Sequence, residues 1–168
     1  MQMDRRTFLA FGGAAMVVGV AVTFPGSERG AEASPPPSGR FPYRLTDAQW
    51  RARLSAMQYR VLRQGETERA GTSPLNNEHR RGTFHCAGCN NPLYASTTKF
   101  ESGTGWPSFW QPLRGAVIER ADDSLGMRRT EILCARCGGH LGHVFNDGPR
   151  PTGLRYCMNG AAMNFRPA

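Results

Sequence analysis

The sequence predicts a single mainly β domain with short flanking helices, preceded by an N-terminal extension. Its 168 residues are enough for one domain with its own core, but fewer than two domains usually need. Two capping-box patterns near the start of the domain predict two short helices. From Gly71 onward the segments are short and are broken by Gly, Pro and Asn, which is typical of β-strands joined by loops.

The extension, residues 1–33, resembles a twin-arginine export signal. It begins MQMDRRTFLAFGGAAMVVGVAVTF, with Arg5 and Arg6 adjacent and no further charge until Glu28. A positive start, an apolar middle and the A-x-A-like exit AEA are the three parts of a secretory signal. We therefore expect cleavage after Ala33 and a periplasmic or secreted protein.

A retained membrane anchor is the alternative for this extension. The uncharged run over residues 8–24 has 17 residues, and a spanning helix needs about 17 to 25. Three glycines interrupt the run, and residues 34–42, which include SPPPSG, read as a disordered linker. These features favour a cleaved signal, so we expect no stable membrane insertion after cleavage.

The folded domain is predicted for residues 43–168 and begins with the two helices. In TDAQ, residues 46–49, and in SAMQ, residues 55–58, a hydroxyl residue is followed three positions later by Gln, which is the capping-box pattern. The second helix should end near Gly65. The side chains expected to face the core are Trp50 and Leu54 from the first helix, and Tyr59, Val61 and Leu62 from the second.

Two strand predictions matter for the site. Residues 117–120 and 127–133 flank ADDSLG and form a hairpin candidate. The last strand is GLRYCMN, in which successive side chains point to opposite faces. Leu154, Tyr156 and Met158 therefore share one face, whereas Arg155, Cys157 and Asn159 share the polar one.

Four of the five cysteines form two C-x2-C pairs that are separated by 44 residues. Two such pairs supply opposite edges of a tetrahedral thiolate site, so the spacing favours a structural zinc ion. Gly88 and Gly138 suit the tight turns that such pairs need. Two disulfides and redox-active pairs are the alternatives. The predicted ligands of one Zn²⁺ are Cys86, Cys89, Cys134 and Cys137.

The net charge of +8 is unchanged by removal of residues 1–33, which hold three Arg and three acidic residues. A basic surface of this kind suggests nucleic acid as a partner. The basic residues are scattered along the chain, however, and Lys99 is the only lysine. We therefore expect a solvated basic surface and no nucleic-acid partner.

Cys157 is the cysteine left over after this pairing. A free cysteine is often a small buried hydrophobe, whereas an unpaired thiol in an exported protein is a liability unless it is used. A reactive role needs the thiolate, which a nearby Arg or imidazolium favours. Arg155 is close in sequence, and GGHLGHVFNDG supplies His140 and His143, although this spacing also suits a ligand pair or simple turn residues.

Five blocks of the sequence resemble peptide methionine sulfoxide reductase B. They are YRVLRQG, FHCAGCNNPLY, KFESGTGWPSF, RRTEILCARCGGHLGHVFNDGP and PTGLRYCMN, and the resemblance runs from about Tyr43 to Phe165. It implies a zinc-stabilised fold of two antiparallel sheets with helices packed outside. It also implies reduction of the R epimer of methionine sulfoxide, free or in exported proteins and peptides. We expect a monomer.

The resemblance assigns roles to the residues that match its motifs. Cys157 corresponds to the nucleophile, which attacks the sulfoxide sulfur and becomes a sulfenic acid. His143, with His140, corresponds to the source of the proton that the leaving oxygen needs. Arg155 would favour the thiolate, with Asp147 orienting either Arg155 or a histidine.

Two further residues are expected around this nucleophile. Asn159 would donate or accept a hydrogen bond within the site. Trp106 would receive the S-methyl group of the substrate on its indole face. Without the resemblance, ordinary core packing would be the better interpretation of Trp106.

Two positions depart from the family pattern. Thr104 stands where many relatives carry a second cysteine that resolves the sulfenic acid, so an external thiol or a thioredoxin-like reductant must do so. Gly160 stands where Ser commonly follows Asn, which removes one hydroxyl near Asn159. The rival hypotheses are a zinc-dependent protein-binding module without catalysis and a structural protein with two disulfides and an inert thiol.

Overall fold

The computed structural model describes residues 41–126 and 128–168. The predicted export signal and most of the predicted linker lie outside the described residues. Within the described part of the chain, no helix has the length and apolar character that a membrane crossing requires.

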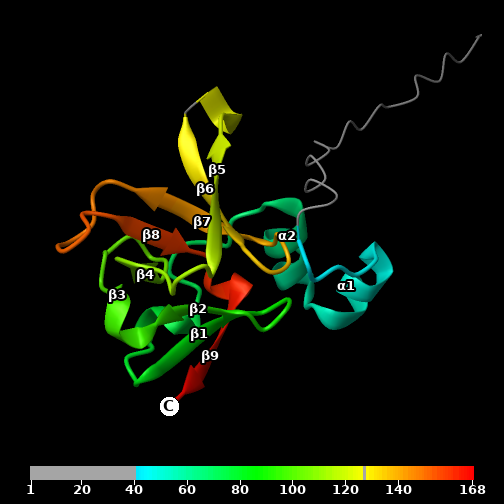
Figure 1. Ribbon diagram of the computed structural model, residues 1–168, viewed down its shortest axis with the longest axis horizontal. Helices are drawn as coiled ribbons and strands as arrows, with labels where there is room; N and C mark the ends of the chain where they lie inside the picture. Colours follow the sequence, from blue (N-terminus) through cyan, green and yellow to red (C-terminus); the bar gives the residue numbers. More distant parts are fainter. Residues whose placement is uncertain (1–40, 127) are drawn as a thin grey trace, which may run out of the picture. The chain divides into compact units, whose positions relative to one another are not determined.

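Two α-helices, nine β-strands and four short 3-10 helices make up the described domain (Figure 1). The helical elements are α1 (Asp47–Arg53), α2 (Ala56–Gln64), η1 (Pro74–Asn77), η2 (Ser96–Thr98), η3 (Ser124–Gly126) and η4 (Gly160–Ala162). The strands are β1 (Gly82–Cys86), β2 (Pro92–Ala95), β3 (Lys99–Phe100), β4 (Ser108–Phe109), β5 (Val117–Asp122), β6 (Arg129–Cys134), β7 (His140–Phe145), β8 (Arg155–Met158) and β9 (Met163–Pro167).

The strands form two antiparallel sheets, which confirms the predicted fold class. The smaller sheet has the order β2-β1-β9, and the larger has the order β3-β4-β8-β7-β6-β5. β5 and β6 form the projecting yellow hairpin at the top of Figure 1. The chain enters the smaller sheet twice, at β1–β2 and again at β9, so its last strand closes the fold.

The core lies where the two sheets face each other, and aromatic contacts connect them. Phe109 of β4 stacks on Tyr94 of β2 with ring centroids 4.3 Å apart, and it meets Phe84 of β1 edge-on at 4.9 Å. The Tyr94 hydroxyl lies 3.1 Å from Met158 Sδ of β8. These side chains are fully buried, so large apolar groups from four strands fix how the two sheets pack against each other.

Both predicted capping boxes are present. Thr46 caps α1 and Ser55 caps α2, each through a reciprocal exchange with the Gln three residues later. The C-cap of α2 is Gly65, which has a left-handed backbone conformation (φ 74°) and whose backbone N–H donates to the carbonyls of Arg60 and Val61 in the last turn. The buried helical side chains are Trp50, Leu54, Tyr59, Val61 and Leu62, as predicted.

The register of the larger sheet confirms the two strand predictions. β5 pairs with β6 as the predicted hairpin, but the connection lies two residues later than predicted, because β5 extends to Asp122 and β6 begins at Arg129. On β8, Tyr156 and Met158 are buried, whereas Arg155 and Cys157 are half-buried on the opposite face. Cys157 therefore lies on the face of the larger sheet that is turned away from Met158 and the core.

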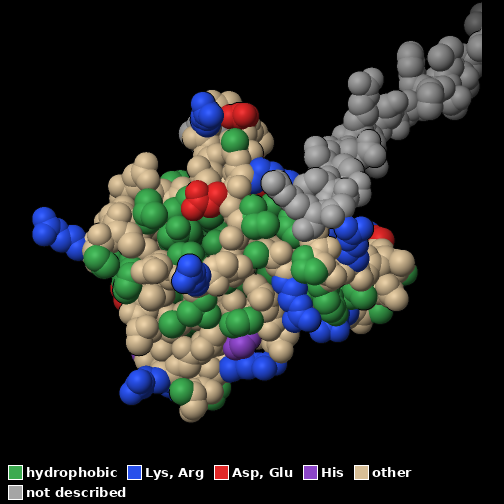
Figure 2. Space-filling view, viewed as in Figure 1, with side chains coloured by type: hydrophobic (Ala, Val, Ile, Leu, Met, Phe, Trp, Pro, Cys, Tyr) green, Lys and Arg blue, Asp and Glu red, His purple; other side chains and the backbone are tan. Residues whose placement is uncertain are grey.

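Basic side chains are dispersed over the surface. On the face shown in Figure 2, Lys and Arg side chains lie at separate places and do not form one patch.

Candidate active site and metal centre

The side chain of Cys157 lines a small pocket on the outer face of the larger sheet. The pocket has a volume of about 160 Å³ and is lined by Thr67, Trp106, Arg129, Gly142, His143, Phe145, Cys157 and Asn159. This volume suits a small group better than a large ligand.

Cross-strand register brings most of the lining residues together. Cys157 of β8 pairs with His143 of β7, which pairs with Glu131 of β6. Phe145 pairs with Arg155 one step further along the same face. Residues that oppose each other in an antiparallel ladder share a face at about 5 Å, so positions far apart in the sequence converge on one thiol.

Asp122 at the tip of β5 connects His143 to Arg129. His143 Nε2 lies 2.8 Å from Asp122 Oδ2, and Arg129 Nη2 donates to the same oxygen at 2.7 Å. Burial alone would raise the pKa of Asp122, but hydrogen bonds from Ser124 and His143 and the charge of Arg129 lower it further than burial raises it. Asp122 is therefore an ionised carboxylate beside the imidazole.

The pKa of His143 lies below its ordinary value. Burial is the main cause, because it disfavours the imidazolium, and the nearby charge of Arg129 acts in the same direction. The hydrogen bond to Asp122 opposes them. His143 is therefore neutral at neutral pH and has a charged partner that would stabilise a second proton.

Asp147 pairs with Arg155, which decides between the two partners predicted for it. Arg155 donates from Nε to Asp147 Oδ1 and from Nη2 to Asp147 Oδ2, both at 2.9 Å. The guanidinium also stacks over Phe145, 4.4 Å from the ring centroid. The pKa of Arg155 is raised, first by the Asp147 hydrogen bond and further by the nearby Cys157 sulfur. The fork fixes a permanent cation next to the thiol.

Glu68 holds two residues of the pocket wall, and the start of η4 next to them, in place. Its backbone oxygen accepts a hydrogen bond from Trp106 Nε1 at 3.1 Å, and its backbone N–H donates to Asn159 Oδ1 at 2.9 Å. Its buried carboxylate accepts from the backbone amides of Gly160 and Ala161. Trp106 is therefore fixed as a wall of the pocket, and both Trp106 and Asn159 depend on one residue that the sequence pattern did not indicate.

His140 does not line the pocket. It is buried, and its Nδ1 lies 2.7 Å from Glu131 Oε1, while Glu131 also pairs with Arg120. The His140 ring meets the His143 ring edge-on at 5.5 Å. His140 therefore lies behind His143, at a distance from the thiol. Within the described residues, His140 Nε2 and Arg129 Nε are buried and have no hydrogen-bond partner.

The two departures from the family pattern both have structural counterparts. Thr104 Oγ1 lies 3.7 Å from Cys157 Sγ, so a hydroxyl stands beside the thiol. At Gly160 the backbone packs against Ser73, and a Cβ there would overlap Ser73 Oγ. Ser73 thus fills the space that a larger residue at position 160 would need.

The four remaining cysteines form one buried cluster. Cys86 Sγ lies 3.7 Å from Cys137 Sγ, and Cys89 Sγ lies 3.5 Å from Cys134 Sγ. All four sulfurs lie within 4.8 Å of one another. An S4 site with bonds of about 2.3 Å places its sulfurs about 3.8 Å apart, so the cluster fits a tetrahedral metal ion. All five cysteines are free, so the alternative of two disulfides is not the arrangement in the structure.

The backbone shapes this cluster differently in its two halves. Gly138, after the second pair, has the left-handed conformation that the tight turn requires (φ 68°). In the first pair the equivalent position is Asn90 (φ 63°), so the expectation for Gly88 is wrong. Gly88 instead allows close packing, because a Cβ there would lie 3.2 Å from the Trp50 ring.

Three arginines donate to the carbonyls of the cysteine pairs. Arg53 Nε reaches Gly88 O at 2.8 Å, Arg136 Nη1 reaches Cys89 O at 2.9 Å, and Arg63 Nη1 reaches Cys137 O at 3.2 Å. Arg53 and Arg63 come from α1 and α2. The cluster therefore connects both helices to the sheets. The three guanidinium groups also lie next to the four sulfurs, which would be negatively charged as thiolates.

The chain matches the family model described as the SelR domain over residues 54–167. It belongs to the SelR domain family. Every strand, the four-cysteine cluster and the whole pocket lie within the matched residues of this SelR domain.

Named relatives of this SelR domain are close in sequence. The chain is 58% identical over 123 residues to a peptide methionine sulfoxide reductase MsrB of Thiobacillus denitrificans, covering 73% of this chain and 93% of that protein. It is 56% identical over 122 residues to one of Leptospira interrogans, covering 72% and 93%. It is 53% identical over 123 residues to the chloroplastic peptide methionine sulfoxide reductase B1 of Oryza sativa, covering 73% and 58%. The resemblance read from the five sequence blocks is thereby confirmed.

Proposed function

We propose that this chain reduces methionine sulfoxide to methionine, with Cys157 as the nucleophile. The observation that carries the proposal is the pocket itself. In a member of the SelR domain family, the one cysteine outside the four-cysteine cluster lies in a pocket beside an indole, an imidazole and a guanidinium. A binding module has no need for this set of groups around a thiol.

The reaction transfers oxygen from one sulfur to another. The Cys157 thiolate attacks the sulfoxide sulfur, and the oxygen takes up a proton. The oxygen, with its proton, then passes to the Cys157 sulfur while the substrate S–O bond and the S–S bond made by the attack both break. Methionine leaves with its lone pair restored, and Cys157 is left as a sulfenic acid. One thiol condenses with the sulfenic acid to give a mixed disulfide and water, and a second thiol releases the enzyme as Cys157–SH.

The residues around the pocket have separate tasks in this proposal. The apolar face of Trp106, held through its Nε1 by Glu68, receives the S-methyl group. Arg155 favours the thiolate of Cys157 over the thiol. We expect Asn159 to orient bound substrate while its amide stays anchored to Glu68 and Leu141.

His143 is the proton donor in this proposal. Because Asp122 is ionised, it accepts the hydrogen on His143 Nε2, which leaves Nδ1 as the nitrogen that takes up the transferable proton. Asp122 stabilises the resulting imidazolium, and the sulfoxide oxygen receives that proton. His140, which lies behind His143, is a positioning residue.

We infer that the reductant is external. Thr104 stands beside Cys157 and cannot form a disulfide, and the other four thiols are held in the cluster. An external thiol or a thioredoxin-like protein therefore attacks the sulfenic acid. The substrate is the R epimer, whether peptide-bound or free, and the chain acts as a monomer.

We propose that the cluster holds one structural Zn²⁺ through Cys86, Cys89, Cys134 and Cys137. The ion would supply binding energy that joins β1, β6 and the loops after them. We also propose export to the periplasm or beyond through cleavage of residues 1–33, so that the substrates are oxidised exported proteins.

The test is reduction of a racemic methionine sulfoxide peptide with dithiothreitol, followed by chromatography. We expect the wild type to consume half of the substrate, the R epimer, and then to stop. The Cys157→Ser variant, which is nearly isosteric, should have no activity above the background. Reduction by this variant, or peptide binding by the wild type without turnover, would rule out the mechanism, and the second result would favour the binding module.

A further inference from the structure

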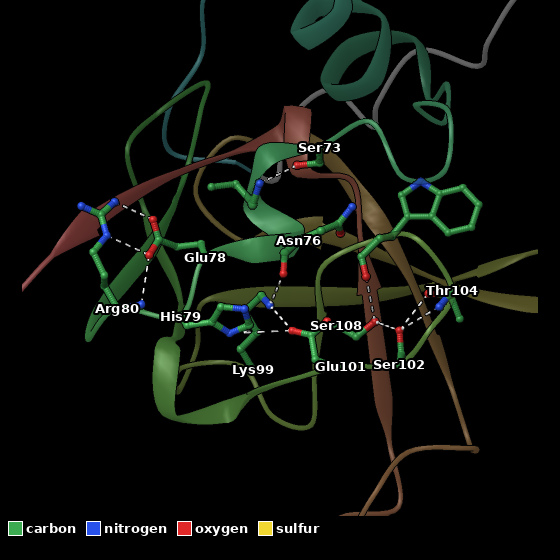
Figure 3. Close-up of polar contacts among 12 residues, drawn as sticks. Ser73, Asn76, Glu78, His79, Arg80, Lys99, Glu101, Ser102, Thr104 and Ser108 are labelled. Atoms are coloured by element: carbon green, nitrogen blue, oxygen red, sulfur yellow. Dashed lines mark hydrogen bonds and ion pairs between the residues drawn. The ribbon is translucent and has the colours of Figure 1, made fainter.

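The hydroxyl groups of Thr104, Ser102 and Ser108 form a chain (Figure 3), and Thr104 at one end of this chain lies beside the nucleophile. Thr104 Oγ1 lies 3.7 Å from Cys157 Sγ and 2.8 Å from Ser102 Oγ. Ser102 Oγ lies 2.7 Å from Ser108 Oγ, and the Ser108 hydroxyl donates to the Trp106 carbonyl oxygen at 3.1 Å. The chain thus runs from the Cys157 sulfur to the backbone of Trp106, which is a wall of the same pocket.

The position of this chain is fixed by the fold. Ser108 of β4 is paired directly with Cys157 of β8, and it is almost completely buried. Among the described residues, its hydroxyl has only two partners, Ser102 and the Trp106 carbonyl. Each hydroxyl group has one hydrogen and can donate only one hydrogen bond. Which group donates in one hydrogen bond of the chain therefore determines which group donates in the next.

When Cys157 is a thiol, all the hydrogens can point away from the sulfur. The S–H donates to Thr104, Thr104 donates to Ser102, Ser102 donates to Ser108, and Ser108 donates to the Trp106 carbonyl. Every hydrogen in the chain is used, and every link has one donor and one acceptor.

When Cys157 is a thiolate, it has no hydrogen to donate and needs a donor. Thr104 can supply one only if it stops donating to Ser102. Ser102 must then donate to Thr104, and Ser108 to Ser102, so the Trp106 carbonyl loses its bond from Ser108. Hydrogen bonds to a charged acceptor are roughly twice as strong as neutral ones, which makes this reversal favourable overall.

We propose that Thr104 is a positioning residue that donates a hydrogen bond to the Cys157 thiolate, and that the hydroxyl chain reverses direction when the thiol ionises. This rests on the proposed function only in that it concerns the same sulfur. Thr104, which occupies the position of the resolving cysteine of many relatives, thus supplies a hydrogen-bond donor to the nucleophile.

Other charged or titratable groups also face Cys157. They are His143 from β7, Arg155 from β8 with its partner Asp147, and Arg129 from β6 with Asp122 from β5. Substitution of Thr104 leaves all of them in place. A change in the ionisation of Cys157 that is produced by removing one hydroxyl is therefore attributable to the chain.

The experiment measures the rate of Cys157 alkylation by iodoacetamide against pH, quantified on the Cys157 peptide by mass spectrometry. In Thr104→Val, which keeps the shape and removes the hydroxyl, we expect the midpoint to rise by about half to one pH unit. Alkylation below the midpoint then slows by roughly threefold to tenfold. Thr104→Ser should restore the wild-type profile. Thr83→Val, in β1 of the other sheet, is the matched control and should not shift it.

Ser102→Ala tests the reversal. Thr104 can still donate in this variant, and ionisation no longer takes the hydrogen bond from the Trp106 carbonyl, so we expect no rise in the midpoint. A Thr104→Val profile that overlays the wild type in a folded, zinc-loaded protein would overturn the proposed donor. A rise in Ser102→Ala equal to that in Thr104→Val would overturn the reversal. Alkylation needs neither sulfoxide nor reductant, so these results are independent of whether the chain reduces methionine sulfoxide.

Discussion

The substitution Thr104→Cys should convert the chain to one that closes its own disulfide. Thr104 Oγ1 lies 3.7 Å from Cys157 Sγ, and a disulfide needs about 2.05 Å. The loop must therefore close by roughly 1.7 Å, and less than that because a C–S bond is longer than a C–O bond. Position 104 is flanked by glycine on both sides, so the backbone can make this adjustment.

The size of the expected effect follows from the length of the closed loop. The two positions are 53 apart in the sequence, and a cross-link of that span stabilises the folded state by about 4 kcal/mol in the chain-entropy model. The oxidised variant should therefore unfold at a higher temperature than its reduced form.

The assay is one turnover with a methionine sulfoxide peptide and no reductant, followed by mass spectrometry under non-reducing conditions. We expect a disulfide between position 104 and Cys157 in the variant. In the wild type we expect a sulfenic acid and no intramolecular disulfide. Thr83→Cys, in the other sheet, adds a thiol without placing it beside Cys157 and is the matched control.

Two results would refute this reasoning. A wild-type protein in which Cys157 becomes joined to one of the four cluster cysteines would show that the cluster is not held apart from the chemistry. A Thr104→Cys variant that stays a sulfenic acid after turnover would show that the loop cannot close.

Three further predictions follow from the site. Metal analysis should find one zinc ion per chain. The Cys86→Ser variant should lose the ion and unfold at a much lower temperature, since structural zinc contributes on the order of 10 kcal/mol of binding free energy to folding. Full stability of the metal-free protein would contradict this. In the Asp122→Asn variant, the pKa of His143 should fall further below its ordinary value, because the hydrogen bond that raises this pKa is weakened while burial remains. NMR titration of the His143 ring protons measures this pKa, and an unchanged or higher value would show that Asp122 does not stabilise the imidazolium. Gly160→Ser should destabilise the fold by about 1–3 kcal/mol through overlap with Ser73, and Ser73→Gly in the same chain should recover most of that loss in a chemical denaturation experiment.

Local sequence patterns were sufficient for the elements whose energetics are local. The capping boxes at Thr46 and Ser55 and the stop at Gly65 depend on groups within five residues of one another. The alternation of β8 depends only on the period of a strand, and it placed Cys157 on the correct face. The spacing of the two cysteine pairs was equally informative, because four sulfurs satisfy one ion only in a narrow set of geometries.

The rest of the site could not be read from local pattern. Asp122 and Arg129 stood in a recognised hairpin, but their contact with His143 depends on the register of β5, β6 and β7 together. Glu68 gave no signal, since a glutamate in a polar loop is ordinary, and its role comes from contacts with residues more than 30 positions away. The place of His140 behind His143 depends likewise on its buried partner Glu131.

By itself, the sequence determined the mainly β fold, the two capped helices, the pairing of four cysteines into one cluster and the identity of the unpaired thiol. Each of these follows from spacing or from bonds between near neighbours. Only the tertiary structure decided what surrounds that thiol: the Asp122 carboxylate, the Glu68 anchor and the hydroxyl chain through Thr104. Those contacts arise from strand register and loop closure between distant parts of the chain. Because each contact joins residues far apart in the sequence, no short segment predicts it.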